Sequence, residues 1–255
     1  MIRLLLATVA LLSVSAIATG ATNNAWAGET NVAVAANFTA PAKAIATAFE
    51  EKTGHKAVLS FGATGQFYAQ IRQGAPFTVF LAADDETPRK AVEEGLAVGD
   101  SRFTYAIGRL VLWSRNPATV TGEDTLRTAA FEKIAIANPA LAPYGAAAVQ
   151  AMKALGVHDA LQPRIVQGNT IAQAHQFAAT GNAEVGFVAL SQVIEAGEGS
   201  RWVVPDSLHA PIRQDAVLLK TGAADEAAKA FLAFLKGPEA GAVIARFGYG
   251  TAASN

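Results

Sequence analysis

Four short stretches of the sequence combine small, neutral polar residues with the start of a predicted helix. They are AANFT (35–39), FGATG (61–65), NPALAPYG (138–145) and QGNTIAQ (167–173). Each should place unpaired backbone N–H groups beside a short hydroxyl or amide at a helix N-terminus, where the helix dipole favours negative charge. None of the four contains Asp, Glu, Lys or Arg. Each turn alone is typical of ordinary helix capping, but together they predict a site that accepts an anion through neutral donors.

Catalytic and metal-binding patterns are much weaker. The four histidines are scattered, without an H-E-x-x-H motif or an i, i+4 pair: His55, His158, His175 and His209. This spacing argues against a zinc site, and a structural role suits His175 on its predicted helix. The stretch GATG (62–65) is too short to indicate a dinucleotide loop, and Asp84 with Asp85 is expected to cap a helix. We therefore expect a binding protein and not an enzyme.

The elements that must position the four turns alternate between short apolar runs and amphipathic helices. Nearly continuous apolar strands that alternate with helices indicate an α/β fold with mostly parallel sheets buried on both faces. Strands are predicted at 31–36, 56–62, 77–83, 133–139, 164–168 and 183–190, and helices at 40–54, 63–74, 87–95, 145–156, 171–181 and 226–248.

Two longer segments interrupt this alternation, at 104–114 and 212–220. We interpret them as strands that cross between two lobes and act as hinges, near 106–109 and 215–217. Lobe I is then expected to comprise residues 28–107 and 217–255, and lobe II residues 108–216. Such folds bind ligands in the cleft at the carboxyl ends of their parallel strands.

The N-terminal 27 residues read as a secretory leader. Arg3 precedes the apolar run LLLATVALLSVSAIA, and AWA (25–27) fits a cleavage site after Ala27. The apolar run is short for a membrane anchor, which is the alternative interpretation. The leader has no cysteine for lipid attachment, so we expect a freely soluble periplasmic protein, with an extracellular product as the alternative.

Composition narrows the possible functions further. The full chain has a formal net charge of −1 and no cysteine. A nearly neutral chain without basic clusters argues against nucleic-acid binding and against a membrane-surface role. The absence of cysteine excludes disulfides, thiolate metal sites and a cysteine nucleophile. Nothing in the sequence calls for an oligomer, so we expect a monomer that is not embedded in the membrane.

At the four turns the chain resembles the periplasmic molybdate-binding proteins of bacterial ABC importers, which are type II substrate-binding proteins. The similarity extends over essentially the whole chain after the leader. Its most specific parts are AANF, SFGATG, YAQIRQGAPFTVFLAADDETP, SRFTYAIGRLVLWS, NPALAPYG, IAQAHQFAATG and GFVALSQV.

The resemblance implies a two-lobed, hinge-bending protein that encloses molybdate, and tungstate as well, and delivers it to a membrane permease. Molybdenum would be held as the oxyanion, without direct metal ligands and without a cofactor. The positions implied for the anion site are Ala36, Asn37, Thr64, Tyr144 and Ile171. The hydroxyl and N–H of Thr64, and the N–H groups of Tyr144 and Ile171, are the donors that the family leads us to expect.

Two positions depart from the family pattern. Some members have a hydroxyl residue where this chain has Ala36, which can offer only its backbone. Others have a tyrosine where this chain has Ala189, and the phenol of Tyr144 can replace it, as in a subgroup of the family. Three alternatives stay open: a sulfate or other oxyanion-binding protein, a periplasmic enzyme on a similar fold, and a sensor module that docks a receptor.

Overall fold

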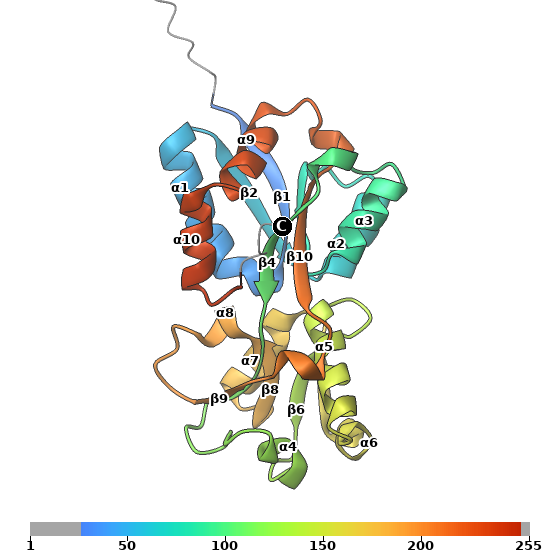
Figure 1. The fold of residues 1–255 in the computed structure, drawn as a ribbon, viewed down its shortest axis with the longest axis vertical. Helices are drawn as coiled ribbons and strands as arrows, with labels where there is room; N and C mark the ends of the chain where they lie inside the picture. The colour runs from blue at the N-terminus through green and yellow to red at the C-terminus, as the bar shows by residue number, and fades with distance from the viewer. Residues whose placement is uncertain (1–26, 251–255) are drawn as a thin grey trace, which may run out of the picture.

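Each half of the protein builds one five-stranded sheet with helices on both sides. The computed structural model describes residues 27–250, and Figure 1 shows the two lobes one above the other. In lobe I the strand order is β2-β1-β3-β10-β4, and in lobe II it is β7-β6-β8-β5-β9. All neighbours pair in parallel except at β10 in lobe I and β5 in lobe II. The predicted mostly parallel α/β architecture is confirmed.

The elements of lobe I come from both ends of the described chain. They are β1 (Glu29–Ala35), the 3-10 turn η1 (Ala36–Phe38), α1 (Thr39–Thr53), β2 (Lys56–Gly62), α2 (Thr64–Arg72), β3 (Val79–Leu81), α3 (Glu86–Glu93), η2 (Gly99–Ser101), β4 (Phe103–Gly108), β10 (Ile212–Leu218), η5 (Lys220–Gly222), α9 (Glu226–Leu235) and α10 (Pro238–Arg246).

Lobe II is one continuous segment of the chain. It contains β5 (Leu110–Ser114), α4 (Asp124–Thr128), β6 (Ile134–Ala137), α5 (Pro143–Ala154), α6 (His158–Leu161), η3 (Gln162–Arg164), β7 (Ile165–Gly168), α7 (Ile171–Thr180), β8 (Val185–Ala189), α8 (Leu190–Val193), β9 (Ser200–Val203) and η4 (Asp206–Leu208).

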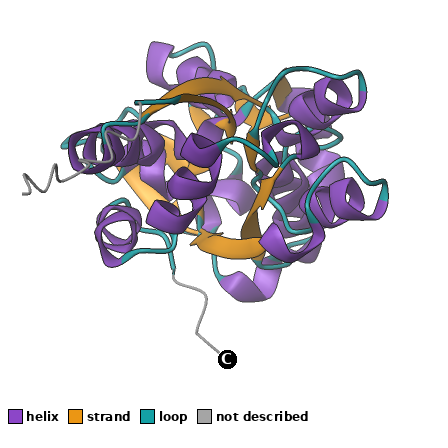
Figure 2. Cartoon of the chain, turned by 90° about the horizontal axis from the view of Figure 1, so that it is seen from above, coloured by secondary structure: helices purple, strands orange, loops and turns teal. Residues whose placement is uncertain are grey.

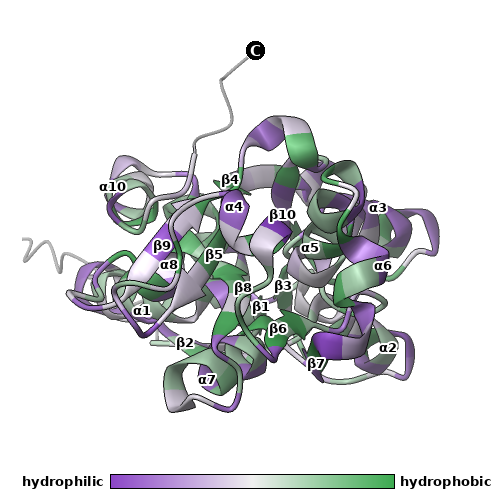
Figure 3. Ribbon diagram, turned by 90° about the horizontal axis from the view of Figure 1, so that it is seen from below, coloured by the Kyte–Doolittle hydropathy of each residue, from purple (hydrophilic) through white to green (hydrophobic). Residues whose placement is uncertain are grey.

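The first strand–helix unit shows how local sequence sets these boundaries. Val32 and Val34 on β1 have no exposed surface, as expected for a strand covered on both faces. Helix α1 buries Ile45 and Phe49 four residues apart and ends at Gly54, which has a left-handed φ of 74°. In Figure 2 the helices surround the sheets, and Figure 3 shows hydrophobic strands inside a ring of helices with more hydrophilic outer sides.

The first crossing differs in detail from the predicted single strand over 104–114. The chain forms β4 in the lobe I sheet, breaks at Arg109, and continues as β5 in the lobe II sheet. A single residue therefore separates two strands of different sheets. The prediction of one long strand was wrong because the apolar pattern runs through the crossing without a turn signal.

The return crossing lies earlier than the expected boundary at residue 217. Strand β10 starts at Ile212 and pairs with β4 from that residue onwards, so the expected boundary falls inside a strand of the lobe I sheet. The pairing of this strand with β4 shifts register between Gln214 and Asp215, as at a β-bulge. We propose that lobe I resumes at about residue 212, and that the segment just before it is the second hinge.

The two lobes are in direct contact. The N–H of Gly65 on α2 donates to the carbonyl of Leu141 in lobe II at 2.9 Å, and Ser191 Oγ on α8 donates to the carbonyl of Asn37 at 2.8 Å. Ala36, Ala63 and Ala83 of lobe I belong to the same buried apolar cluster as the core of lobe II. The structure is thus that of a closed, two-lobed protein.

The sequence also led us to expect no membrane-spanning segment after the leader, and a cleaved leader at the N-terminus. Within residues 27–250, no helix is both long and apolar enough to cross a bilayer. The predicted leader lies outside the described residues except for Ala27.

Candidate functional site

All five residues predicted for the anion site line one cavity between the lobes. Ala36, Asn37 and Thr64 come from lobe I, and Tyr144 and Ile171 from lobe II. The remaining lining residues are small or apolar: Ala35, Gly62, Ala63, Ala83, Ala142 and Pro143. The cavity measures about 10 Å³ and has walls from both lobes. A solute of several atoms can therefore enter only when the lobes move apart.

Thr64 is the first residue of α2 and is almost completely buried. Its Oγ1 accepts a hydrogen bond from the N–H of Ala83 at 3.0 Å. A hydroxyl that accepts from one neighbour still has its own hydrogen to donate. As the first residue of the helix, Thr64 also has a backbone N–H without an intrahelical acceptor. Thr64 can therefore supply two donors to the cavity.

Asn37 lies in η1, between β1 and α1, and its side chain is fully engaged as a donor. Nδ2 donates to Gln214 Oε1 at 2.8 Å and to Tyr249 Oη at 3.0 Å. Both amide hydrogens are thus taken by protein groups, which leaves the backbone of this turn to face an anion. The carbonyl of neighbouring Ala36 accepts from Thr39 Oγ1 at 2.8 Å, so Ala36 also has only its N–H to offer.

Tyr144 is the second residue of α5, and its phenol reaches into the hinge. The hydroxyl accepts from Gln214 Nε2 at 3.2 Å. Burial, with smaller contributions from Tyr249 and Tyr105, raises the pKa of the Tyr144 phenol well above its usual range. The group therefore stays protonated and keeps a hydrogen to donate. Gly108 makes this position possible, because a Cβ there would lie 2.2 Å from the Tyr144 hydroxyl oxygen.

Ile171 is the first residue of α7, and hydrogen bonds with Thr170 and Gln192 fix this end of the helix. Thr170 caps the helix by accepting the N–H of Gln173 at 3.1 Å, and Gln192 Nε2 donates to the carbonyl of Ile171 at 3.2 Å. The N–H of Ile171 has no acceptor within its own helix. Asn169 on the same turn is exposed and does not line the cavity, and Ala189 is buried outside the lining.

A buried polar network behind the cavity was not foreseen from the sequence. Its members beyond Asn37 and Tyr144 are Tyr105, Ser191, Gln214 and Tyr249, each at most 7% exposed. The Tyr105 hydroxyl can donate to the carbonyl of Ala82 at 3.0 Å or to Gln214 Oε1 at 3.1 Å, and Tyr249 Oη lies 2.9 Å from Ser191 Oγ. Gln214 stands between Arg213 and Asp215 in the sequence of β10, so nothing in the local pattern marks it as buried. Ser191 and Tyr249 stand among ordinary helix and turn residues.

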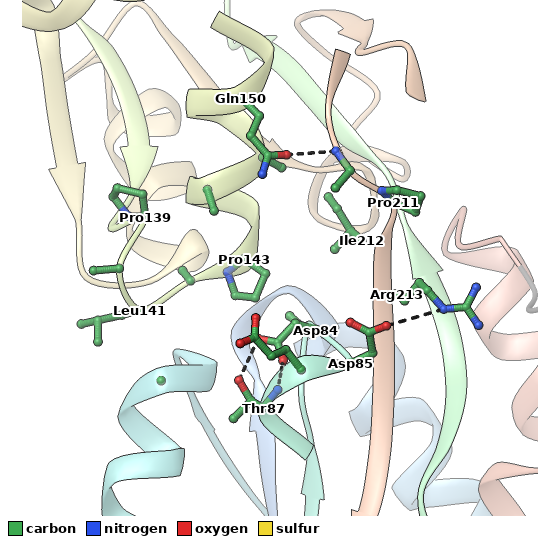
Figure 4. A pocket seen from close by; sticks show the side chains of 18 of the residues that line it. Asp84, Asp85, Thr87, Pro139, Leu141, Pro143, Gln150, Pro211, Ile212 and Arg213 are labelled. Atoms are coloured by element: carbon green, nitrogen blue, oxygen red, sulfur yellow. Dashed lines mark hydrogen bonds and ion pairs between the residues drawn. The ribbon is translucent and has the colours of Figure 1, made fainter. Parts of the chain in front are cut away.

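The cavity has no ionised group in its lining, whereas the adjoining cleft has several. Figure 4 shows this cleft, which measures about 400 Å³ and includes Asp84, Asp85 and Arg213. Asp84 caps α3 by accepting the Thr87 N–H at 2.7 Å, as the sequence predicted for this acidic pair. Burial raises the pKa of the Asp84 carboxyl, and the two hydrogen bonds from Thr87 oppose that rise.

Two of the histidines, His55 and His175, pack and bond in ways that suit a structural role. His55 Nδ1 accepts the Gly28 N–H at 3.0 Å, and the ring of His175 lies 5.2 Å from that of Trp113. Burial lowers the pKa of His175. Across the described part of the chain, no three acidic, histidine or cysteine side chains gather to hold a metal ion.

Two lobes joined by two crossings, with a small neutral cavity between them, define a type II solute-binding protein. Residues 30–250 match the family described as bacterial extracellular solute-binding protein. The molybdate-binding protein ModA of Rhodobacter capsulatus is 60% identical over 227 residues, which are 89% of this chain and 90% of that protein. ModA of Azotobacter vinelandii is 58% identical, over 89% of this chain and 91% of that protein.

Solved structures agree with this relationship. The periplasmic molybdate-binding protein of Azotobacter vinelandii superposes with a TM-score of 0.85 at 43% identity, covering 88% of this chain and 99% of that one. The sulfate-binding protein SubI of Mycobacterium tuberculosis has a TM-score of 0.71 at 15% identity, which shows a shared fold alone. The chain belongs to the bacterial extracellular solute-binding proteins, in their ModA family. It is therefore a binding protein and not an enzyme, as the sequence predicted.

Proposed function

We propose that this protein captures molybdate in the periplasm, and tungstate as a close analogue, for delivery to the permease of an ABC importer. The observation that carries the proposal is the cavity itself, in which four strand-to-helix junctions from two lobes converge without any ionised side chain. The names of the two ModA relatives supply the anion. Molybdate is then cargo and not a cofactor, and we expect the protein to act as a monomer.

The proposed contacts are the N–H groups of Ala36, Thr64, Tyr144 and Ile171, with the hydroxyls of Thr64 and Tyr144. Asn37 contributes through the backbone of its turn. A hydrogen bond to a charged group contributes on the order of 1.5–3 kcal/mol. About six such bonds, reduced by desolvation and closure, are enough for the roughly 11 kcal/mol of nanomolar-range affinity.

Donors alone also give selectivity by protonation state. A fully deprotonated dianion can accept a hydrogen bond from every donor. Hydrogen phosphate has an O–H that needs an acceptor, and the cavity side chains proposed here offer hydrogens instead. A buried polar group without its partner costs about 1–3 kcal/mol, so protonated oxyanions should be rejected.

The size of the closed cavity argues against an organic ligand, and because about 10 Å³ is the space for roughly one water molecule, a tetrahedral oxyanion also needs the walls to move back. Pockets for organic ligands typically measure about 300–1,000 Å³, and this cavity measures about 10 Å³. An amino acid or a sugar would need a much larger space between the closed lobes. Sulfate stays the competing anion, because neutral donors cannot distinguish tetrahedral dianions by charge.

Isothermal titration of the chain from residue 28, stripped of bound anion, tests the proposal. Molybdate and tungstate should bind with submicromolar dissociation constants, while sulfate and phosphate should give no heat above dilution. A preference for sulfate would keep the fold and correct the anion. Absence of binding to all four would contradict the proposed function.

A further inference from the structure

Asn37 is held by a ring of hydrogen bonds that spans the two lobes. Its Nδ2 donates to Tyr249 Oη at 3.0 Å, Tyr249 Oη donates to Ser191 Oγ at 2.9 Å, and Ser191 Oγ donates to the carbonyl of Asn37 at 2.8 Å. The Tyr249 hydroxyl also lies 2.8 Å from the carbonyl of Asn37, so its single hydrogen is shared between that carbonyl and Ser191 Oγ, and the ring is complete when the hydrogen points to Ser191. Asn37 and Tyr249 belong to lobe I, and Ser191 belongs to lobe II.

The ring is closed off from water. Asn37, Ser191 and Tyr249 are 2%, 7% and 6% exposed. Buried polar groups strengthen one another when every member is paired and are costly when one is left alone. Opening the lobes would separate Ser191 from both of its partners, so the ring favours the closed arrangement.

The position of Tyr249 is fixed independently of the ring. The next residue, Gly250, exchanges two backbone hydrogen bonds with Ile107 on β4, at 2.8 and 2.9 Å. Gly248 has a φ of 77°, and a Cβ there would lie within 2.8 Å of Leu190 and Ile194 beside Ser191. Residues 248–250 are thus held against β4 on one side and against Leu190 and Ile194 on the other.

We propose that Ser191 and Tyr249 are positioning residues of the anion site. Through Asn37 they tie lobe II to the turn that carries Ala36, and so they set the fraction of the protein that is closed before the anion binds. Neither residue lines the cavity or needs to touch the anion. The inference rests on the proposed function, but its first test requires no anion.

The test uses fluorescence energy transfer between dyes on the two lobes. The chain has no cysteine, so E93C on α3 and D159C on α6, both exposed, can be labelled specifically. Without anion, Ser191→Ala and Tyr249→Phe should lower the equilibrium between closed and open forms about three- to tenfold, the effect of one hydrogen bond. Ser207→Ala, an exposed serine of η4, and Tyr68→Phe, on α2 outside the ring, are the matched controls.

Titration with sodium molybdate completes the experiment. The dissociation constant should rise in proportion to the fall in the closed fraction, through faster dissociation, while transfer at saturation should equal that of the wild type. Ser191→Thr keeps the hydroxyl and should restore the closed fraction. An unchanged closed fraction and dissociation constant in both ring variants would overturn the proposal. If the wild type does not bind molybdate but the two ring variants still lower the closed fraction, the proposed function is wrong and the positioning role stands.

Discussion

The anion cavity and the cleft beside α3 lie on the same boundary between the lobes, and both are lined by Ala83 and Ala142. The cleft is about forty times larger, at about 400 Å³ against about 10 Å³, and it contains both acidic and basic side chains. No residue that lines the cavity is an Asp, Glu, Lys, Arg or His. For the dianion that we propose as ligand, we expect enclosure and convergent N–H groups to matter more than a large open volume.

The cavity and the cleft should respond very differently to an added negative charge. Ala36→Asp places a carboxylate in the cavity, where repulsion of an anion about 4 Å away costs about 4 kcal/mol per pair of charges. We expect molybdate binding to fall by at least about a thousandfold. Ala140→Asp, on the exposed lining of the cleft, is the matched control and should change the affinity only slightly.

Circular dichroism must show that Ala36→Asp is folded before its affinity is interpreted. Retention of wild-type affinity in the folded variant would place the anion elsewhere on the lobe boundary.

The three buried tyrosines at the cavity and behind it should set the alkaline limit of stability. Burial raises the pKa of Tyr105, Tyr144 and Tyr249 above the ordinary value of 10.0. The folded state therefore holds neutral phenols, and their stabilisation is complete below pH 10 and is lost as the pH rises above it. Between pH 10 and the raised pKa of the folded state, each tyrosine lowers the free energy of unfolding by about 1.4 kcal/mol per pH unit.

Absorbance at the phenolate band, followed together with circular dichroism, measures this alkaline transition. These three tyrosines should ionise only as the protein unfolds, and early ionisation of all of them in the folded state would contradict their burial.

Removal of the Thr64 hydroxyl should affect both binding and folding. Thr64→Val loses one donor to the anion and leaves the Ala83 N–H without its acceptor. We expect affinity to fall by about 1.5–3 kcal/mol and stability by about 1–3 kcal/mol. Thr64→Ser keeps the hydroxyl and should bind almost like the wild type. Equal affinities of the Val and Ser variants in calorimetry would exclude the hydroxyl from the site.

The Tyr144 phenol offers a finer test, because it already accepts from Gln214. If its hydrogen is donated to the anion, Tyr144→Phe should weaken molybdate binding by about 1–3 kcal/mol. Tyr68→Phe, on α2 and outside the cavity, is the control. An unchanged dissociation constant would restrict Tyr144 to its backbone N–H and the hinge network.

The smallest effect is expected in the cleft. Lys90 lines it and pairs with Glu86 at 2.6 Å on the surface of α3. Such exposed pairs contribute about 0–1 kcal/mol to stability. Lys90→Ala should therefore leave the equilibrium affinity within about twofold. A large loss of affinity would show that the anion uses the charged cleft and would remove the contrast between the two regions.

The sequence determined the elements and the chemistry of the turns. Apolar runs with Gly54 and similar stops marked most strands and helices, because periodicity and capping are local properties. The neutral turns at Asn37 and Thr64 were recognisable for the same reason. The crossing at Arg109 was not, because a strand that changes sheets has the same local pattern as one that continues.

Only the tertiary structure decided what the donors at the site are free to do. Asn37 has a side-chain amide in any conformation, but Gln214 and Tyr249 lie 177 and 212 residues further along the chain and take both of its hydrogens. Ser191 meets the same turn from the other lobe, 154 residues further along the chain. The local sequence decides which residues stand at the helix starts. Long-range contacts decide which of their hydrogens remain for an anion, and such contacts leave no periodic signal in the sequence.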